Sequence, residues 1–97
     1  MTQLDLIIAT IQQIKPELYD RYGVSSIGIF GSVVRNDFSN SKSDIDVIVD
    51  FSKPIGIEFI DLAEFLETKF KRKIDLVSKN GIKIKYFREI EREIIYV

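Results

Sequence analysis

Two aspartates separated by one residue, Asp44 and Asp46, open the apolar, β-branched run DIDVIVDF at residues 44–51. If this run is a strand, side chains two positions apart share a face, so both carboxylates project together while the hydrophobic residues between them face the core. Carboxylates this close repel each other, and a hard cation such as Mg²⁺ would remove the repulsion. A solvent-exposed loop edge with an aspartate cap has the same sequence, so the pair alone permits either interpretation. Asp50 shares their face at the far end of the run and is interpreted as structural.

Gly31 and Ser32 directly follow a second β-prone run and could bind a phosphate group. Glycine lets the backbone approach an anion closely, and a turn or helix that begins there presents N–H groups to it. The Ser32 hydroxyl could donate to a phosphate oxygen, although capping of the turn is the simpler role. The dipeptide is common, and both roles are compatible.

A third carboxylate, Asp75, lies inside the β-prone run KIDLV. An acid within a buried strand is costly unless a cation or an ion pair balances it. The neighbouring basic residues 71–73 could supply an ordinary ion pair. Asp75 is therefore either a third ligand of a metal site or a structural residue.

The elements that would position these residues follow from hydrophobic spacing. Helical spacing predicts a helix from residue 2 to 14, which Pro16 ends or restarts, and Gly23 is suited to end a further turn. Strands are predicted at 25–30, 44–51 and 73–77, helices at 57–70 and 82–93, and a turn or brief helix at 31–35. In the last helix Tyr86, Phe87 and Ile90 are expected to face inward.

This order, αβαβαβα, predicts a single domain over residues 1–97 of the α/β (α+β) class. The expected architecture is a small mixed three-stranded sheet packed with about four helices. The first two strands are most simply antiparallel, and the helix at 57–70 is a crossover of suitable length for a parallel third strand. The glycine turn and all three carboxylates then meet at one end of the sheet.

Composition excludes several kinds of chemistry. The chain has neither cysteine nor histidine, so disulfides, thiolate metal sites, His-ligated zinc and His-based triads are impossible. The N-terminal segment has no basic region before its apolar residues and carries Asp5, so we expect no signal peptide, no membrane span and a cytoplasmic protein. The net charge of −1 argues against general nucleic-acid binding, although residues 69–97 are basic and could attract an acidic partner.

Three segments together resemble the DNA polymerase β-like nucleotidyltransferase superfamily. GIFGSVVRNDFSNSKSDIDVIVDF resembles its motif of a hydrophobic strand ending in Gly-Ser, about ten residues, and then Asp-x-Asp. RKIDLVSKNGIK resembles the strand of the third carboxylate, and YFREIEREIIYV is similar to the C-terminus of the minimal nucleotidyltransferase subgroup. The likeness spans residues 24–97. One departure is Asn36, where many relatives have glycine after the arginine that matches Arg35.

The resemblance implies an ATP-dependent nucleotidyl transfer with two Mg²⁺ ions. It implies that Asp44 and Asp46 bind the ions and that Asp75 completes the second site and helps to activate the acceptor hydroxyl. Gly31 and Ser32 would hold the triphosphate. Arg35 would be a further phosphate contact.

The resemblance to the minimal nucleotidyltransferase subgroup also implies which molecule accepts the nucleotide. Minimal nucleotidyltransferases are paired with a helical HEPN-type toxin, and the resemblance implies an antitoxin that transfers AMP to a hydroxyl of that toxin, tyrosine being the expected acceptor. Two alternatives remain open. The chain could neutralise its partner by binding alone, or it could be the nucleotide-binding subunit of a small-molecule, antibiotic-modifying nucleotidyltransferase.

Overall fold

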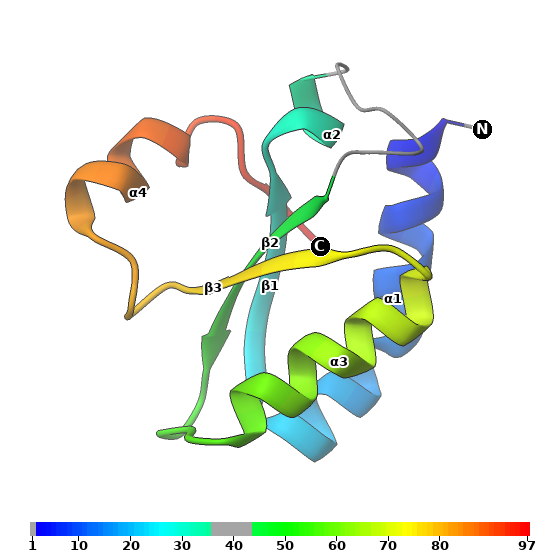
Figure 1. The fold of residues 1–97 in the computed structure, drawn as a ribbon, viewed down its shortest axis with the longest axis vertical. Helices are drawn as coiled ribbons and strands as arrows, with labels where there is room; N and C mark the ends of the chain where they lie inside the picture. Colours follow the sequence, from blue (N-terminus) through cyan, green and yellow to red (C-terminus); the bar gives the residue numbers. More distant parts are fainter. Residues whose placement is uncertain (1, 36–43) are drawn as a thin grey trace.

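The computed structural model describes residues 2–35 and 44–97, which form one sheet with helices on both of its faces (Figure 1). The elements in chain order are α1 (Gln3–Tyr22), β1 (Val24–Phe30), α2 (Ser32–Arg35), β2 (Ile45–Phe51), α3 (Glu58–Phe70), β3 (Ile74–Ser78), α4 (Ile84–Ile90) and β4 (Ile95–Tyr96). Each predicted helix and strand is present. Most boundaries lie within a residue or two of those expected, but α4 is shorter at both ends than the predicted helix.

The sheet has four strands in the order β3-β2-β1-β4. β1 and β2 are antiparallel, and β2 and β3 are parallel, with α3 as the crossover between them. These relations agree with the prediction of a mixed sheet. The expected count of three strands was wrong, because the apolar C-terminus adds β4 antiparallel to β1. β4 has only two residues, too few for a periodic pattern to reveal.

The first helix begins at a capping box in which the Thr2 side chain accepts the N–H of Asp5 and the Asp5 side chain accepts the N–H of Thr2. It continues through Pro16 to Tyr22, so the predicted break at Pro16 was wrong. Pro16 lies on the exposed side of the helix, where water can solvate the carbonyl that loses its partner. Gly23 ends the helix with φ of 68°, as predicted.

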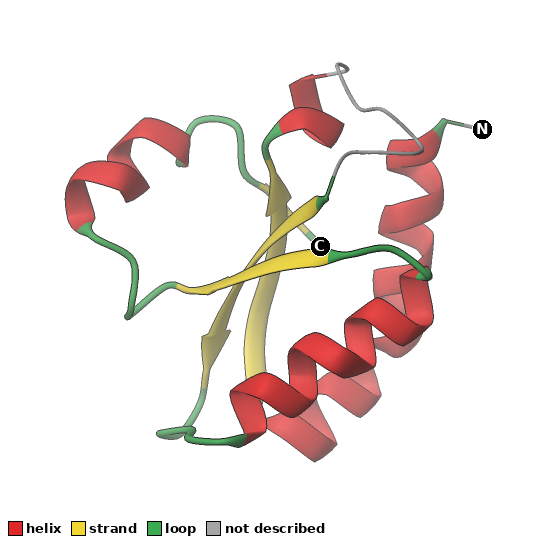
Figure 2. Cartoon of the chain, viewed as in Figure 1, coloured by secondary structure: helices red, strands yellow, loops and turns green. Residues whose placement is uncertain are grey.

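Helices lie on both faces of the sheet (Figure 2), and two apolar clusters hold them there. α1 and α3 cover one face, where the buried residues are Ile7, Ile11, Ile14, Leu18, Tyr22, Val24, Ile27, Ile29, Val33, Ile45, Val47, Val49, Leu62, Leu66 and Ile74. α4 covers the other face through Ile90, which packs with Phe30 and Ile48. Phe87 is half-buried, whereas Tyr86, expected to face inward, is 46% exposed because α4 contacts the sheet along a narrow stripe.

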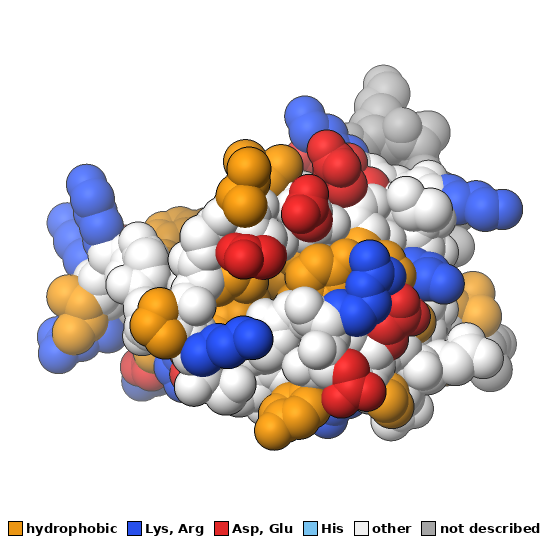
Figure 3. Space-filling view, turned by 90° about the horizontal axis from the view of Figure 1, so that it is seen from below, with side chains coloured by type: hydrophobic (Ala, Val, Ile, Leu, Met, Phe, Trp, Pro, Cys, Tyr) orange, Lys and Arg blue, Asp and Glu red, His pale blue; other side chains and the backbone are white. Residues whose placement is uncertain are grey.

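The surface carries charges of both signs. Figure 3 shows basic, acidic and apolar side chains interspersed on the face that it draws, with no single charge covering it. In the parts of the chain that the structure describes, no helix combines the length and hydrophobicity needed to cross a bilayer.

The packing of β4 on β1 gives a first prediction. A Cβ atom at Gly28 would lie 2.7 Å from Ile94 Cγ2 and 3.2 Å from the Ile95 carbonyl oxygen. We therefore expect Gly28→Ala to lower the free energy of unfolding by about 1–3 kcal/mol, as overpacking does. Urea denaturation measures this. The control is Gly56→Ala, where the nearest atom is Glu58 Oε2 at 3.7 Å; equal stability of the two variants would contradict the described position of β4.

Candidate nucleotide and metal site

The predicted site residues lie at the end of the sheet where β1 ends and β2 and β3 begin. Phe30, the last residue of β1, is the register partner of Asp46, and Asp46 is the register partner of Asp75 on the parallel strand β3. Gly31 follows Phe30 directly. The antiparallel and parallel pairings therefore bring the glycine turn and two of the three carboxylates together, as the predicted topology requires.

The carboxylates of Asp46 and Asp75 interact directly. The pKa of Asp46 is raised from 3.8 to about 6, first by burial, then by the charge of Asp75, a hydrogen bond to it, and the charge of Asp44, while Arg35 lowers it. A protonated Asp46 can donate to Asp75, which relieves the repulsion of the pair. A divalent cation could replace that proton.

Asp44 and Asp75 differ from Asp46 in exposure. Asp44 lies just before β2 and is exposed. Asp75 was expected inside a buried strand, but it is exposed because β3 is an edge strand of the sheet. Among the residues that the structure describes, no three acidic side chains are close enough to form a preassembled metal cluster. Mg²⁺ commonly takes one or two carboxylates and completes its shell with water and substrate phosphates, so the Asp46–Asp75 pair fits such an ion.

Gly31 is in contact with Asp46. It is buried and has φ of 78°, and a Cβ atom at this position would overlap the Asp46 carboxylate, with Cγ only 2.9 Å away. Its carbonyl accepts the N–H groups of Val34 and Arg35, which closes the short helix α2. The residue must therefore be glycine because of the adjacent carboxylate, a reason that the sequence did not reveal. Ser32 begins α2 beside this turn and is half-buried.

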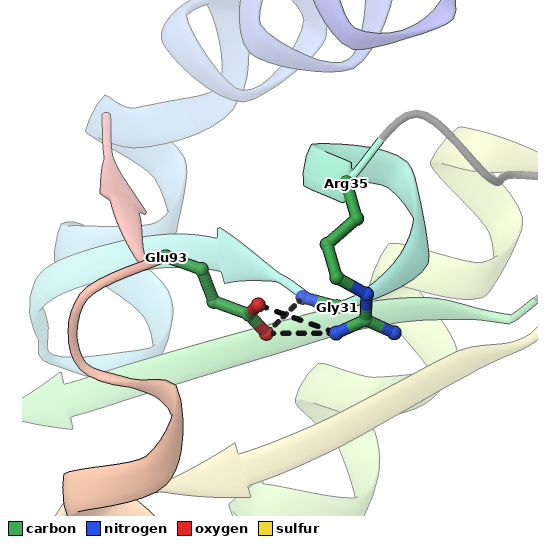
Figure 4. Close-up of polar contacts among 3 residues, drawn as sticks. All are labelled: Gly31, Arg35 and Glu93. Carbon is green, nitrogen blue, oxygen red and sulfur yellow. Dashed lines mark hydrogen bonds and ion pairs between the residues drawn. The ribbon is translucent and has the colours of Figure 1, made fainter.

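A residue that the sequence analysis missed, Glu93, binds the same turn (Figure 4). Its Oε1 accepts the Gly31 N–H at 3.0 Å and Arg35 Nη1 at 3.1 Å, and its Oε2 accepts Arg35 Nη1 at 3.2 Å. Glu93 lies in the mixed-charge stretch FREIEREIIYV, where no spacing distinguishes it from Glu89 or Glu91. Asn36, which stands where many members of the resembled family have glycine, lies outside the described residues.

Comparison with known proteins identifies the chain. The sequence profile of the family described as nucleotidyltransferase domain matches residues 11–96. The chain belongs to this nucleotidyltransferase family. It is 39% identical over 98 residues to the protein adenylyltransferase MntA of Thermococcus cleftensis, covering 100% of this chain and 98% of that protein. It is also 37% identical over 99 residues to a putative protein adenylyltransferase of Methanocaldococcus jannaschii, with both chains fully covered.

Solved structures share the nucleotidyltransferase fold. A toxin–antitoxin structure of a MntA–HpeT mutant superposes with a TM-score of 0.70 at 20% identity, covering 88% of this chain and 69% of that one. A toxin–antitoxin structure with AMP-PNP superposes with a TM-score of 0.62 at 26% identity, covering 74% and 59%. A tri-AMPylated HEPN toxin in complex with MNT antitoxin of Shewanella oneidensis gives a TM-score of 0.67 at 20% identity, covering 91% and 68%. The nucleotidyltransferase interpretation of the sequence is thus confirmed.

The raised pKa of Asp46 gives a second prediction. The folded-state pKa of Asp46, about 6, lies above the ordinary value of 3.8. The protonated Asp46 side chain therefore does not lower the stability of the fold below pH 3.8, and stability is lost as the pH rises through about 6 and the group ionises. At pH 7.5 the ionised group should cost about 1–2 kcal/mol after allowance for solvent screening. Asp46→Asn should therefore be more stable than the wild type at pH 7.5 without added metal, and the difference should shrink towards pH 4.

Urea denaturation of both proteins at several pH values measures this difference. Asp50→Asn is the matched control, because Asp50 lies on the same strand at its other end and accepts the N–H of Phe51, which an amide oxygen can also accept. The difference in stability between Asp50→Asn and the wild type should not change with pH as it does for Asp46→Asn. A destabilised Asp46→Asn at pH 7.5 would show that the carboxylates do not repel each other.

Proposed function

We propose that this nucleotidyltransferase transfers AMP from ATP, with Mg²⁺, to a tyrosine hydroxyl of a HEPN-type toxin and so acts as an antitoxin. The observation that carries the proposal is the pairing of Asp46 with Asp75 on neighbouring parallel strands, directly beside the Gly31 turn. Hard oxygen ligands next to a glycine turn suit a metal–triphosphate complex. The names of the relatives support the choice of a protein as acceptor and of AMP as the transferred group.

Each site residue has a separate role in this proposal. Asp44 and Asp46 hold the cation that accompanies the triphosphate, and Gly31 and Ser32 lie against the phosphates. Asp75 is exposed on the edge strand β3, and in this proposal it acts on the acceptor hydroxyl. Mg²⁺, when bound there, would neutralise charge on the triphosphate and favour the deprotonated form of the acceptor hydroxyl.

The reaction needs no nucleophilic side chain from the protein. The acceptor oxygen forms a bond to the α-phosphorus of ATP, the bond from that phosphorus to the oxygen of the β-phosphate breaks, and pyrophosphate leaves. The hydroxyl proton passes to solvent. The protein positions the two reactants and balances their charge, so the absence of histidine and cysteine is no obstacle.

A third prediction separates an enzyme from a protein that neutralises its partner by binding alone. Asp75→Asn should keep much of the affinity for Mg·ATP, because Asp44 and Asp46 remain. Transfer should fall by at least about a hundredfold, the usual scale for losing a group that acts on the reacting atoms. Intact-mass spectrometry of the HEPN partner after incubation with ATP and Mg²⁺ measures transfer, and calorimetric titration measures binding.

Asp50→Asn serves again as the control and should transfer at the wild-type rate. If the wild type neutralises the partner without adding adenylyl groups, the protein is a binding antitoxin and the proposal is wrong. If Asp75→Asn transfers as fast as the wild type, Asp75 has no role in the reaction.

A further inference from the structure

Glu93 connects the C-terminal segment to the Gly31 turn. It lies 62 residues from Gly31 in sequence, in the segment between α4 and β4. The next residue, Ile94, packs against Gly28 and belongs to the smaller apolar cluster. The position of the Glu93 backbone is therefore fixed by the packing of its neighbour on the sheet, and its carboxylate is held at the end of β1.

Hydrogen bonds hold the Gly31 residue at both of its polar groups. Glu93 accepts its N–H, and its carbonyl accepts two N–H groups of α2. Between these bonds the backbone touches the Asp46 carboxylate, with no space for a side chain. A shift of the turn would therefore change both the distance to Asp46 and the surface presented to a phosphate.

Arg35 contacts the same carboxylate. Its Nη1 lies 3.1 Å from Glu93 Oε1 and 3.2 Å from Oε2, and the Glu93 side chain is only 22% exposed. A half-buried carboxylate that accepts hydrogen bonds from a guanidinium and from a backbone N–H makes charge-assisted bonds, which are stronger than bonds between neutral groups. Arg35 thus neutralises Glu93 and holds it against the turn.

We propose that Glu93 is a positioning residue for the nucleotide turn, and that Arg35 acts through Glu93 instead of binding the triphosphate. This inference rests on the proposed nucleotide site at Gly31 and replaces the phosphate contact expected for Arg35. The two possibilities predict effects of opposite sign. If Arg35 bound the triphosphate, Glu93 would compete for it, and removing the Glu93 charge would strengthen nucleotide binding. If Glu93 positions the turn, its removal weakens binding.

A double-mutant cycle distinguishes these possibilities. Mg·ATP is titrated calorimetrically into the full chain as wild type, Glu93→Ala, Glu93→Gln, Arg35→Ala and the double alanine variant. We expect Glu93→Ala to weaken binding roughly tenfold, as loss of a charge-assisted hydrogen bond does. Glu93→Gln should recover part of this, because its amide oxygen can still accept the Gly31 N–H. Arg35→Ala should weaken binding less in the Glu93→Ala background than in the wild type. Glu91→Gln, an exposed glutamate on the same segment, should bind like the wild type.

Tighter binding by Glu93→Gln would overturn the proposal, as would an equal loss from Arg35→Ala in the wild-type and Glu93→Ala backgrounds. Glu93→Gln preserves the shape of the side chain, so it answers the question even where Glu93→Ala does not fold.

Amide hydrogen exchange of Gly31, measured without nucleotide, tests whether Glu93 holds the Gly31 turn. The Gly31 N–H should exchange slowly in the wild type and Glu93→Gln and at least tenfold faster in Glu93→Ala, relative to an N–H in the centre of β2. Equal exchange in all three would overturn the positioning role. Failure of the wild type to bind Mg·ATP would instead overturn the proposed function, and the exchange experiment would then still decide whether Glu93 holds the turn.

Discussion

The repulsion between Asp46 and Asp75 is the constraint around which the rest of the structure is arranged. The two residues are register partners on parallel strands, and their separation is set by the sheet and not by their charges. Their neighbours Ile45, Val47 and Ile74 are buried under α1 and α3. These apolar contacts hold the strands in place and keep the two carboxylates close, and burial together with the charge of Asp75 raises the pKa of Asp46.

The glycine turn depends on the same pair. Gly31 can pass the Asp46 carboxylate only because it has no side chain, and its φ of 78° directs the chain into α2. Glu93 accepts the N–H of the same glycine and so connects the turn to the C-terminal segment. The C-terminal segment therefore has two functions, since it covers the second face of the sheet and supports the turn. Loss of the packing on the sheet or of the Glu93 bond to the turn would therefore change the position of Gly31 against the Asp46 carboxylate.

The sequence predicted what local patterns can encode. The alternation in β2 and the helical spacing in α1 and α3 gave the elements, and the crossover rule gave the parallel pairing that joins Asp46 to Asp75. Pro16 was misjudged because tertiary packing of α1 outweighs one missing hydrogen bond. β4 and Glu93 were missed because both depend on contacts between residues far apart in sequence. The residues that could do chemistry were thus visible in the sequence, but the residue that supports them was not.

Cation binding and stability are linked through Asp46. A cation bound between the two carboxylates would replace a proton near neutral pH and would remove their mutual repulsion. Because such a cation would bind the folded chain and not the separated strands of the unfolded chain, each increment of its affinity would also stabilise the fold. The closeness of Asp46 and Asp75 in the free protein would therefore favour the cation-bound state.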